Sequence, residues 1–185
     1  MAGGREFDRQ RFKELILFIA DQSKDDPRFG ATKLNKILYF ADFKAFLALG
    51  SSISGATYIR MDRGPVPEEM LATLREMEDA GDISRVERKY YNYTQKVVVP
   101  LRDSAVEDLL SSAERELLEA VLSELRLLDA AQVSALSHLD HGWRIADDRE
   151  VIPYESAFIS DRKPTATELR IWRQDIDERR RQRAG

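Results

Sequence analysis

The stretch that decides the fold is TKLNKILYFADFKAFLA, residues 32–48. Its apolar residues recur at intervals of three and four positions, a spacing that predicts an α-helix. One stripe consists of Leu34, Ile37, Leu38, Ala41 and Ala45, but aromatic residues populate the other faces as well. A helix that is apolar nearly all round is normally buried. We therefore expect residues 32–48 to form the central helix of the core.

Two polar residues interrupt this helix on a shared face. Asn35 and Asp42 lie seven positions apart, which corresponds to about two helical turns. A carboxylate in an apolar setting is stable only when it is hydrogen-bonded or paired with a cation. We expect Asp42 to pair with Asn35 or with a lysine, and to have a structural role.

The pattern outside the central helix predicts further helices and one β-hairpin. Residues 57–61 are typical of a short strand, and residues 83–99 of a hairpin with its tip near Tyr91 and Asn92. The remaining periodic segments predict four more helices: residues 6–22, a helix from Pro67 to about Gly81, one capped by Ser111 and Glu114, and one capped by Asp129 and Gln132 that ends at Gly142. A helix, a short turn and a twisted hairpin in this order resemble a winged helix.

The fold class predicted from these elements is α+β and predominantly helical. We expect one compact domain over residues 1–160, built around the central helix, followed by a charged helical tail over residues 161–185. Thr165 and Glu168 are placed to cap the tail helix, which carries Leu169, Trp172 and Ile176 on one side and ends in an arginine-rich run.

Composition narrows the class of protein. The chain has 185 residues, of which 43% are hydrophobic and 34% charged, and its net charge is −4. It contains no cysteine, which excludes a disulfide framework, a thiolate nucleophile and a thiolate zinc site. It has no apolar run near the ~18 residues that a membrane span needs, and its N-terminus lacks a signal peptide. We expect a cytoplasmic protein without a membrane partner.

Candidate catalytic groups are few. His138 and His141 have the spacing that would place them side by side on a helix, where Asp140 or Asp147 would have to join them to hold a metal. The alternative interpretation is two histidines in a last helical turn, where the helix dipole favours them, and we prefer it. Nucleophile-elbow and phosphate-loop motifs are absent from the sequence. We expect neither an enzyme nor a cofactor.

The hairpin is the first candidate for binding a macromolecule. Its basic residues are Arg85, Arg88, Lys89 and Lys96, and they surround Tyr90, Tyr91 and Tyr93. Such a mixture suits phosphates and bases, but it also suits a solvated hairpin. The preceding helix is acidic, with Glu68, Glu69, Glu76, Glu78 and Asp79 against Arg75 alone, which disfavours DNA. Nucleic acid therefore stays possible but is not the preferred partner.

The tail is the second candidate. Its arginines form either a solvated helix end or, together with Trp172, a docking element for a partner. The partner-binding residues that we single out in the whole chain are Tyr90, Tyr91, Trp172, Arg179 and Arg180.

Three segments resemble the Panacea domain of SocA-like antitoxins. The first covers residues 32–42. The second joins Gly55-Ala56-Thr57-Tyr58 to Arg63-Gly64-Pro65-Val66-Pro67. The third joins Leu136-Ser137-His138, Gly142-Trp143 and Ile152-Pro153-Tyr154-Glu155.

The resemblance implies an antitoxin of a toxin–antitoxin system, with a role in bacterial or phage defence. Such a protein neutralises a cognate toxin protein, encoded by an adjacent gene, through direct contact. The family provides no catalytic residue to transfer to this chain. The alternative functions are a winged-helix transcription regulator and, third, a metal-dependent enzyme.

Overall fold

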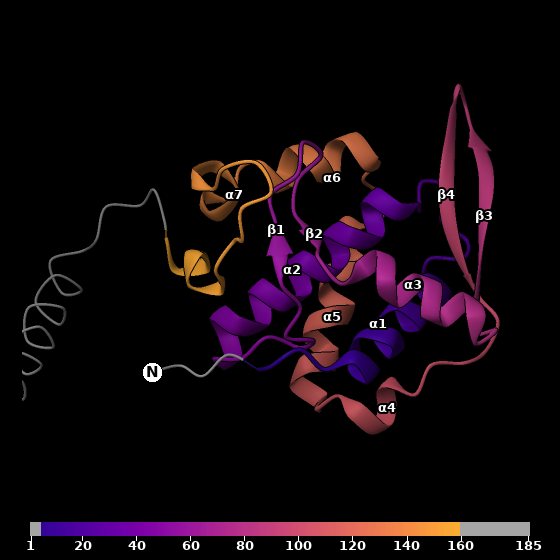
Figure 1. Ribbon diagram of the computed structural model, residues 1–185, viewed down its shortest axis with the longest axis horizontal. Coiled ribbons are helices and arrows are strands. Elements are labelled where there is room, and N and C mark those ends of the chain that lie inside the picture. The colour runs from indigo at the N-terminus through magenta and orange to yellow at the C-terminus, as the bar shows by residue number, and fades with distance from the viewer. Residues whose placement is uncertain (1–4, 160–185) are drawn as a thin grey trace, which may run out of the picture.

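The structure is a computed structural model that describes residues 5–159 (Figure 1). Its helices and strands occur in the following order: α1 (Arg9–Gln22), α2 (Ala31–Leu49), β1 (Tyr58–Ile59), β2 (Val66–Pro67), α3 (Met70–Asp79), β3 (Ile83–Tyr90), β4 (Tyr93–Pro100), α4 (Val106–Leu109), α5 (Ser112–Leu125), α6 (Ala130–Ser137), α7 (His141–Ile145) and the 3-10 helix η1 (Tyr154–Phe158). The predicted α+β, predominantly helical fold class is confirmed. The expected tail helix, with Trp172, Arg179 and Arg180, lies outside the described residues.

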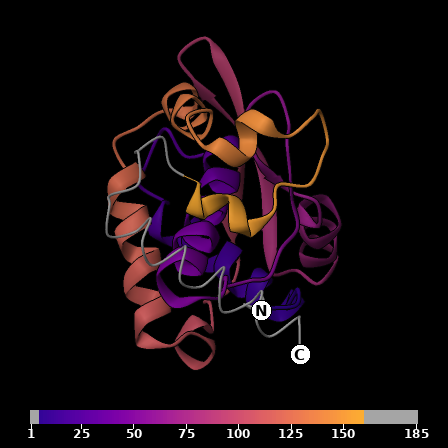
Figure 2. The same ribbon diagram turned by 90° about the vertical axis from the view of Figure 1, so that its left-hand side faces the viewer.

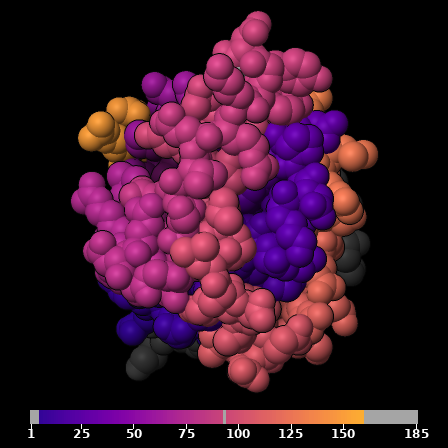
Figure 3. All heavy atoms as spheres, turned by 90° about the vertical axis from the view of Figure 1, so that its right-hand side faces the viewer, coloured from indigo at the N-terminus to yellow at the C-terminus, as the bar shows by residue number. Residues whose placement is uncertain are grey.

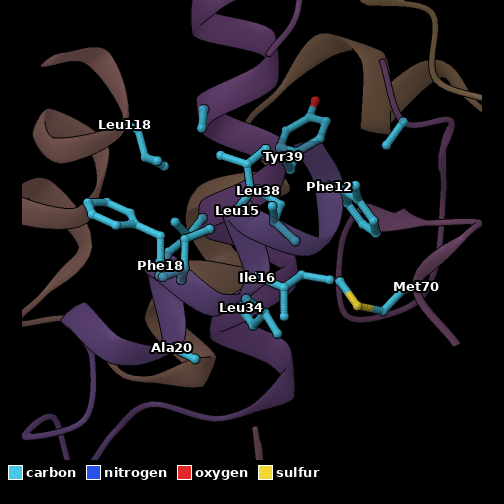
Figure 4. Packing of buried hydrophobic residues seen from close by; sticks show 14 of the residues in the cluster. Phe12, Leu15, Ile16, Phe18, Ala20, Leu34, Leu38, Tyr39, Met70 and Leu118 are labelled. Atoms are coloured by element: carbon cyan, nitrogen blue, oxygen red, sulfur yellow. The ribbon is translucent and has the colours of Figure 1, made fainter. Parts of the chain in front are cut away.

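Helix α2 is the centre of the molecule, as its sequence predicts. It contacts α1, α5, α6, η1, β2 and β4. Figures 1 and 2 show α2 enclosed by the other helices, with α5 along one side and η1 near its C-terminal end. Figure 4 shows Leu34, Leu38 and Tyr39 of α2 packed among Phe12 and Leu15 of α1 and Leu118 of α5. Burial on all sides explains why its apolar residues are not confined to one stripe.

The connection from α2 to α3 differs from the sequence-based prediction. Pro67, expected as the first residue of a helix, belongs instead to β2 and pairs with Tyr58 of β1. Helix α3 begins three residues later, at Met70. The expected strand over residues 57–61 is shorter, and it gains a partner strand that the sequence did not indicate. A two-residue strand that includes a proline has no periodicity to detect. Because proline is common at the first position of a helix, the sequence instead predicted that a helix begins at Pro67.

Both predicted capping boxes are present, and one of them has a second role. Ser111 and Glu114 cap α5, while Asp129 and Gln132 cap α6. The carboxylate of Glu114 also accepts hydrogen bonds from the guanidinium groups of Arg5 and Arg11, each at 2.9 Å. It therefore fixes the start of α5 against α1.

The hairpin forms the edge of the molecule. Strands β3 and β4 pair in register from Ile83–Pro100 to Tyr90–Tyr93, which confirms the predicted hairpin and its two-residue tip. The base of the hairpin is part of the core, since Ile83, Val97 and Val98 are buried. The distal half projects beyond the helices (Figures 1 and 3). Within residues 5–159, no helix is long and apolar enough to cross a membrane.

Candidate functional site

Asp42 lies at the point where the first and second Panacea-like segments meet. Its buried carboxylate accepts hydrogen bonds from the backbone N–H groups of Ile53 and Ser54, both at 2.8 Å, and from the Ser54 hydroxyl at 2.5 Å. The Tyr58 hydroxyl donates to its second oxygen at 2.8 Å. Asp42 thus holds the loop after α2, and the expected pairing with Asn35 or a lysine is wrong. Burial raises the pKa of Asp42, against the opposing effect of these donors.

The third segment reaches the same place through Tyr154. Its hydroxyl donates to the carbonyl oxygen of Ala56 at 2.7 Å, and its ring packs against Phe43 with 4.7 Å between centroids. Tyr58 meets both aromatic rings edge-on. Three segments that are far apart in the sequence are therefore joined around one carboxylate.

Lys36 provides a second junction, which the sequence analysis missed. This lysine is 1% exposed, and its Nζ donates to the carbonyl oxygen of Pro65 at 2.9 Å. Gly64 has a φ of +94°, and a Cβ there would collide with the end of Lys36 and with Ser137. Burial lowers the pKa of Lys36 to about 7. The position of Lys36 next to Ile37 and Leu38, in a helix expected to be buried, was the available signal.

The two histidines do not share a helix. Helix α6 ends at Ser137, so His138 caps it and His141 begins α7. His138 instead stacks on Trp143, with 3.8 Å between ring centroids, and the indole N–H donates to the carbonyl oxygen of Met61 at 3.0 Å. Burial lowers the pKa of His138, and the charges of Lys36 and Arg60 add to that effect. Within residues 5–159, no three potential ligands lie close enough together to hold a metal ion.

These residues form what we call the buried polar centre: Lys36, Asp42, Ser54, Tyr58 and Ser137. Each is at most 1% exposed. The polar groups of Lys36, Asp42, Ser54 and Tyr58 hold connecting segments against α2, whereas the Ser137 hydroxyl donates to the Ser134 carbonyl oxygen within α6. An external molecule could not reach these groups without opening the core. This part of the Panacea-like segments therefore forms an internal framework, whereas Arg63, Pro153 and Glu155 of the same segments are exposed.

A second buried lysine lies beside a pocket of about 230 Å³ between α1, α2 and α5. Lys33 is one of its lining residues, and its Nζ donates to Asp26 at 2.5 Å and to the carbonyl oxygens of Arg126 and Leu128, both at 2.8 Å. These three acceptors use all three N–H groups of its ammonium. Lys33 therefore ties the α1–α2 connection to the end of α5 and has no donor left for a ligand.

The surface outside this framework is most distinctive at the hairpin. Tyr91 is 87% exposed, and its ring meets that of Tyr90 edge-on at 4.9 Å. Tyr91 has a φ of +51°, a left-handed conformation that costs a non-glycine residue energy. Arg88, Lys89 and Lys96 are exposed on the arms below. The structure thus places Tyr90 and Tyr91 at one projecting tip, with exposed basic residues on the arms below it.

The acidity of α3 is partly neutralised by surface ion pairs within the chain. Glu76 pairs with Arg9 at 2.5 Å and with Lys13 at 3.1 Å, while Glu78 pairs with Arg85 of β3. The side chain of Glu69 accepts from the Thr57 N–H. Repulsion of a phosphate backbone by α3 is consequently weaker than the count of acidic residues suggests.

Comparison with known families identifies the chain. The model of the family described as "Antitoxin SocA-like, Panacea domain" matches residues 34–144, which is more than half of the chain. The protein belongs to this family. Neither the curated proteins nor the solved structures include a match.

Proposed function

We propose that this protein is an antitoxin that neutralises a cognate toxin protein, encoded by an adjacent gene, by binding it directly. The observation that carries the proposal is the separation of framework from surface. Lys36, Asp42 and Tyr58 of the Panacea-like segments are buried, whereas the hairpin presents exposed aromatic and basic side chains on its projecting part. Neutralisation by contact needs only a complementary surface on a stable domain, so we propose a binding protein rather than an enzyme.

The hairpin tip suits a protein interface. Binding energy in such interfaces is concentrated in tyrosine, tryptophan and arginine side chains. Tyr90, Tyr91 and Arg88 provide this chemistry within one short segment. A specific interface buries about 1,200–2,000 Å² in total and involves about 20–30 residues on each side, more residues than a hairpin tip contains. We propose that Trp172, Arg179 and Arg180 of the tail contribute the remaining contacts.

Co-expression tests the function. The chain should be harmless when expressed alone and should restore growth when expressed with a toxic product of the adjacent gene. Tyr91→Ala should weaken rescue while leaving the melting temperature within a few degrees of the original. Ile145→Ala, at an exposed apolar residue of α7 on the other side of Figure 1, is the matched control and should rescue fully. Failure to rescue any toxic neighbour would exclude the proposal.

The alternative is a winged-helix DNA-binding regulator, which the α3–hairpin arrangement and the paired acids of α3 favour. Salt dependence distinguishes the two functions, because each phosphate contact releases counterions and steepens the fall of affinity with salt. We expect only non-specific duplex binding, with a Kd of about 10⁻⁴ to 10⁻⁶ M at physiological salt. Tight and sequence-dependent retardation of the gene's own promoter would support the regulator instead.

A further inference from the structure

The two edges of the hairpin differ in how they are covered. The backbone of β4 lies against the α1–α2 connection: the Gln95 side chain donates to the carbonyl oxygen of Pro27 at 2.6 Å. A Cβ on Gly30 would approach the Lys96 carbonyl oxygen to 3.4 Å. Among the described residues, the sheet has only these two strands, so no other strand pairs with the outer edge of β3. Figure 1 shows β4 on the side of the helices and β3 outside it.

The hydrogen bonding of Arg85 shows which backbone groups lie on the outer edge of β3. Its N–H donates to the Glu78 carboxylate at 3.2 Å and therefore points away from β4. In an antiparallel pair, alternate residues direct both backbone groups to the same side. The N–H and C=O groups of Glu87 and Lys89 therefore lie on this free edge. The Glu78 carboxylate already accepts from the outward N–H of Arg85. The part of the edge whose outward backbone groups are still unpaired by another strand therefore runs from Glu87 to the tip.

The side chains around the open stretch indicate which charge a strand that binds there should have. Arg88, Lys89 and Lys96 are exposed, whereas Glu87 is the one acidic residue of the hairpin. The charge of Arg85 is already balanced by Glu78. An added strand would thus meet an excess of positive charge, together with the tyrosines of the tip. Acidic side chains on that strand complement this surface.

We propose that the free edge of β3, at Glu87–Lys89, accepts an extended acidic segment of the toxin as a third strand of the hairpin. Strand addition gives affinity through main-chain hydrogen bonds and specificity through side chains that alternate along the strand. The charged side chains of β3 also fit this role, because they discourage pairing between copies of an open edge in the absence of a partner. This inference rests on the proposed function and specifies the surface and the partner's chemistry.

A proline placed on the open edge tests the proposal. Glu87→Pro removes an outward N–H that β4 does not use, a position where a strand tolerates proline. Glu87→Gln is the matched control, since it removes the same charge and keeps the N–H. In titrations of the full-length chain with the purified toxin, we expect Glu87→Pro to raise Kd roughly tenfold or more. Glu87→Gln should bind at least as tightly as the original chain. Equal Kd values for a folded Glu87→Pro and Glu87→Gln would overturn the proposal.

Amide hydrogen exchange provides a test that needs no variant. Toxin binding should slow exchange at the outward amides of Glu87 and Lys89, because exchange follows the opening of hydrogen bonds. Unchanged exchange at both amides in a saturated complex would overturn strand addition, even if Glu87→Pro fails to fold.

Charge reversal tests the acidic partner. Lys89→Glu should weaken toxin binding, and reducing the ionic strength should increase the difference from the original chain. If Lys89→Glu abolishes binding to duplex DNA but leaves toxin binding unchanged, the edge of β3 binds nucleic acid rather than the toxin, and the proposal is wrong. If the unaltered chain neither binds nor rescues a toxin, the proposed function fails and this inference fails with it.

Discussion

The buried polar centre and the hairpin contain polar residues of similar kinds, but the structure uses them in opposite ways. The carboxylate of Asp42 accepts hydrogen bonds from four donors of its own chain. The ammonium group of Lys36 donates to the Pro65 carbonyl oxygen. Tyr91 and Lys89 are exposed instead. Polar groups at the centre maintain the fold, whereas those of the hairpin are available to a partner. If the proposed function is correct, the motifs by which the chain is recognised are poor guides to its binding surface.

The largest effect should come from the centre of the core. Leu38→Asp places an unpaired carboxylate in α2, where Leu38 is 1% exposed. The cost of several kcal/mol is comparable with the total stability of a domain. We expect the cooperative thermal transition to disappear. A melting curve that is unchanged would show that α2 is not the centre of the fold.

Asp42→Ala should be the next most damaging change. It leaves the N–H groups of Ile53 and Ser54 and the Tyr58 hydroxyl without their acceptor. Each unpaired buried donor costs about 1–3 kcal/mol, so we expect a loss of at least ~3 kcal/mol in chemical denaturation. Asp148→Ala, which removes an exposed carboxylate, should change stability by about 0.5 kcal/mol or less. Equal effects of the two variants would remove the distinction between the regions.

Lys36 should make stability depend on pH in the alkaline range. The pKa of Lys36 is about 7 in the folded protein, against a reference value of 10.5, so unfolding takes up a proton between these values. The free energy of unfolding should therefore rise as the pH increases from about 7 to 10. The rise should amount to a few kcal/mol, since one pKa unit corresponds to about 1.4 kcal/mol. Lys36→Met should lack this rise. Identical pH slopes in denaturant titrations of the two proteins would contradict the prediction.

The smallest change in stability should come from the hairpin tip. Tyr91→Gly relieves a positive φ and removes a ring that is 87% exposed. Relief of strain and the greater flexibility of glycine oppose each other, so we expect a net change within about 1 kcal/mol. Rescue of a toxin should nevertheless weaken. A large loss of stability would place the tip within the framework rather than on a binding surface.

Sequence patterns predicted the elements that depend on periodicity or on local hydrogen bonds. Helix α2, the hairpin and both capping boxes are examples, because each leaves a signal within a short segment. The junctions were not predictable in this way. Asp42 binds a loop eleven or more positions away, and Pro65 accepts from Lys36 across 29 positions. The separation of His138 from His141 likewise follows from a new helix that Asp140 caps, which helical spacing does not reveal.

The ladder of β3 and β4 has a consequence for how the protein could acquire new targets. The arms pair without interruption down to a two-residue tip, and only the base is embedded in the core. Another in-register hairpin could replace residues 86–97 if it kept the apolar residue at Val97 and the Gln95 contact with Pro27. Substitutions confined to residues 86–97 could then change which partner the protein binds, with little loss in the stability of the fold. The rest of the sequence could meanwhile change slowly. A library confined to these positions is the natural starting point for retargeting the protein.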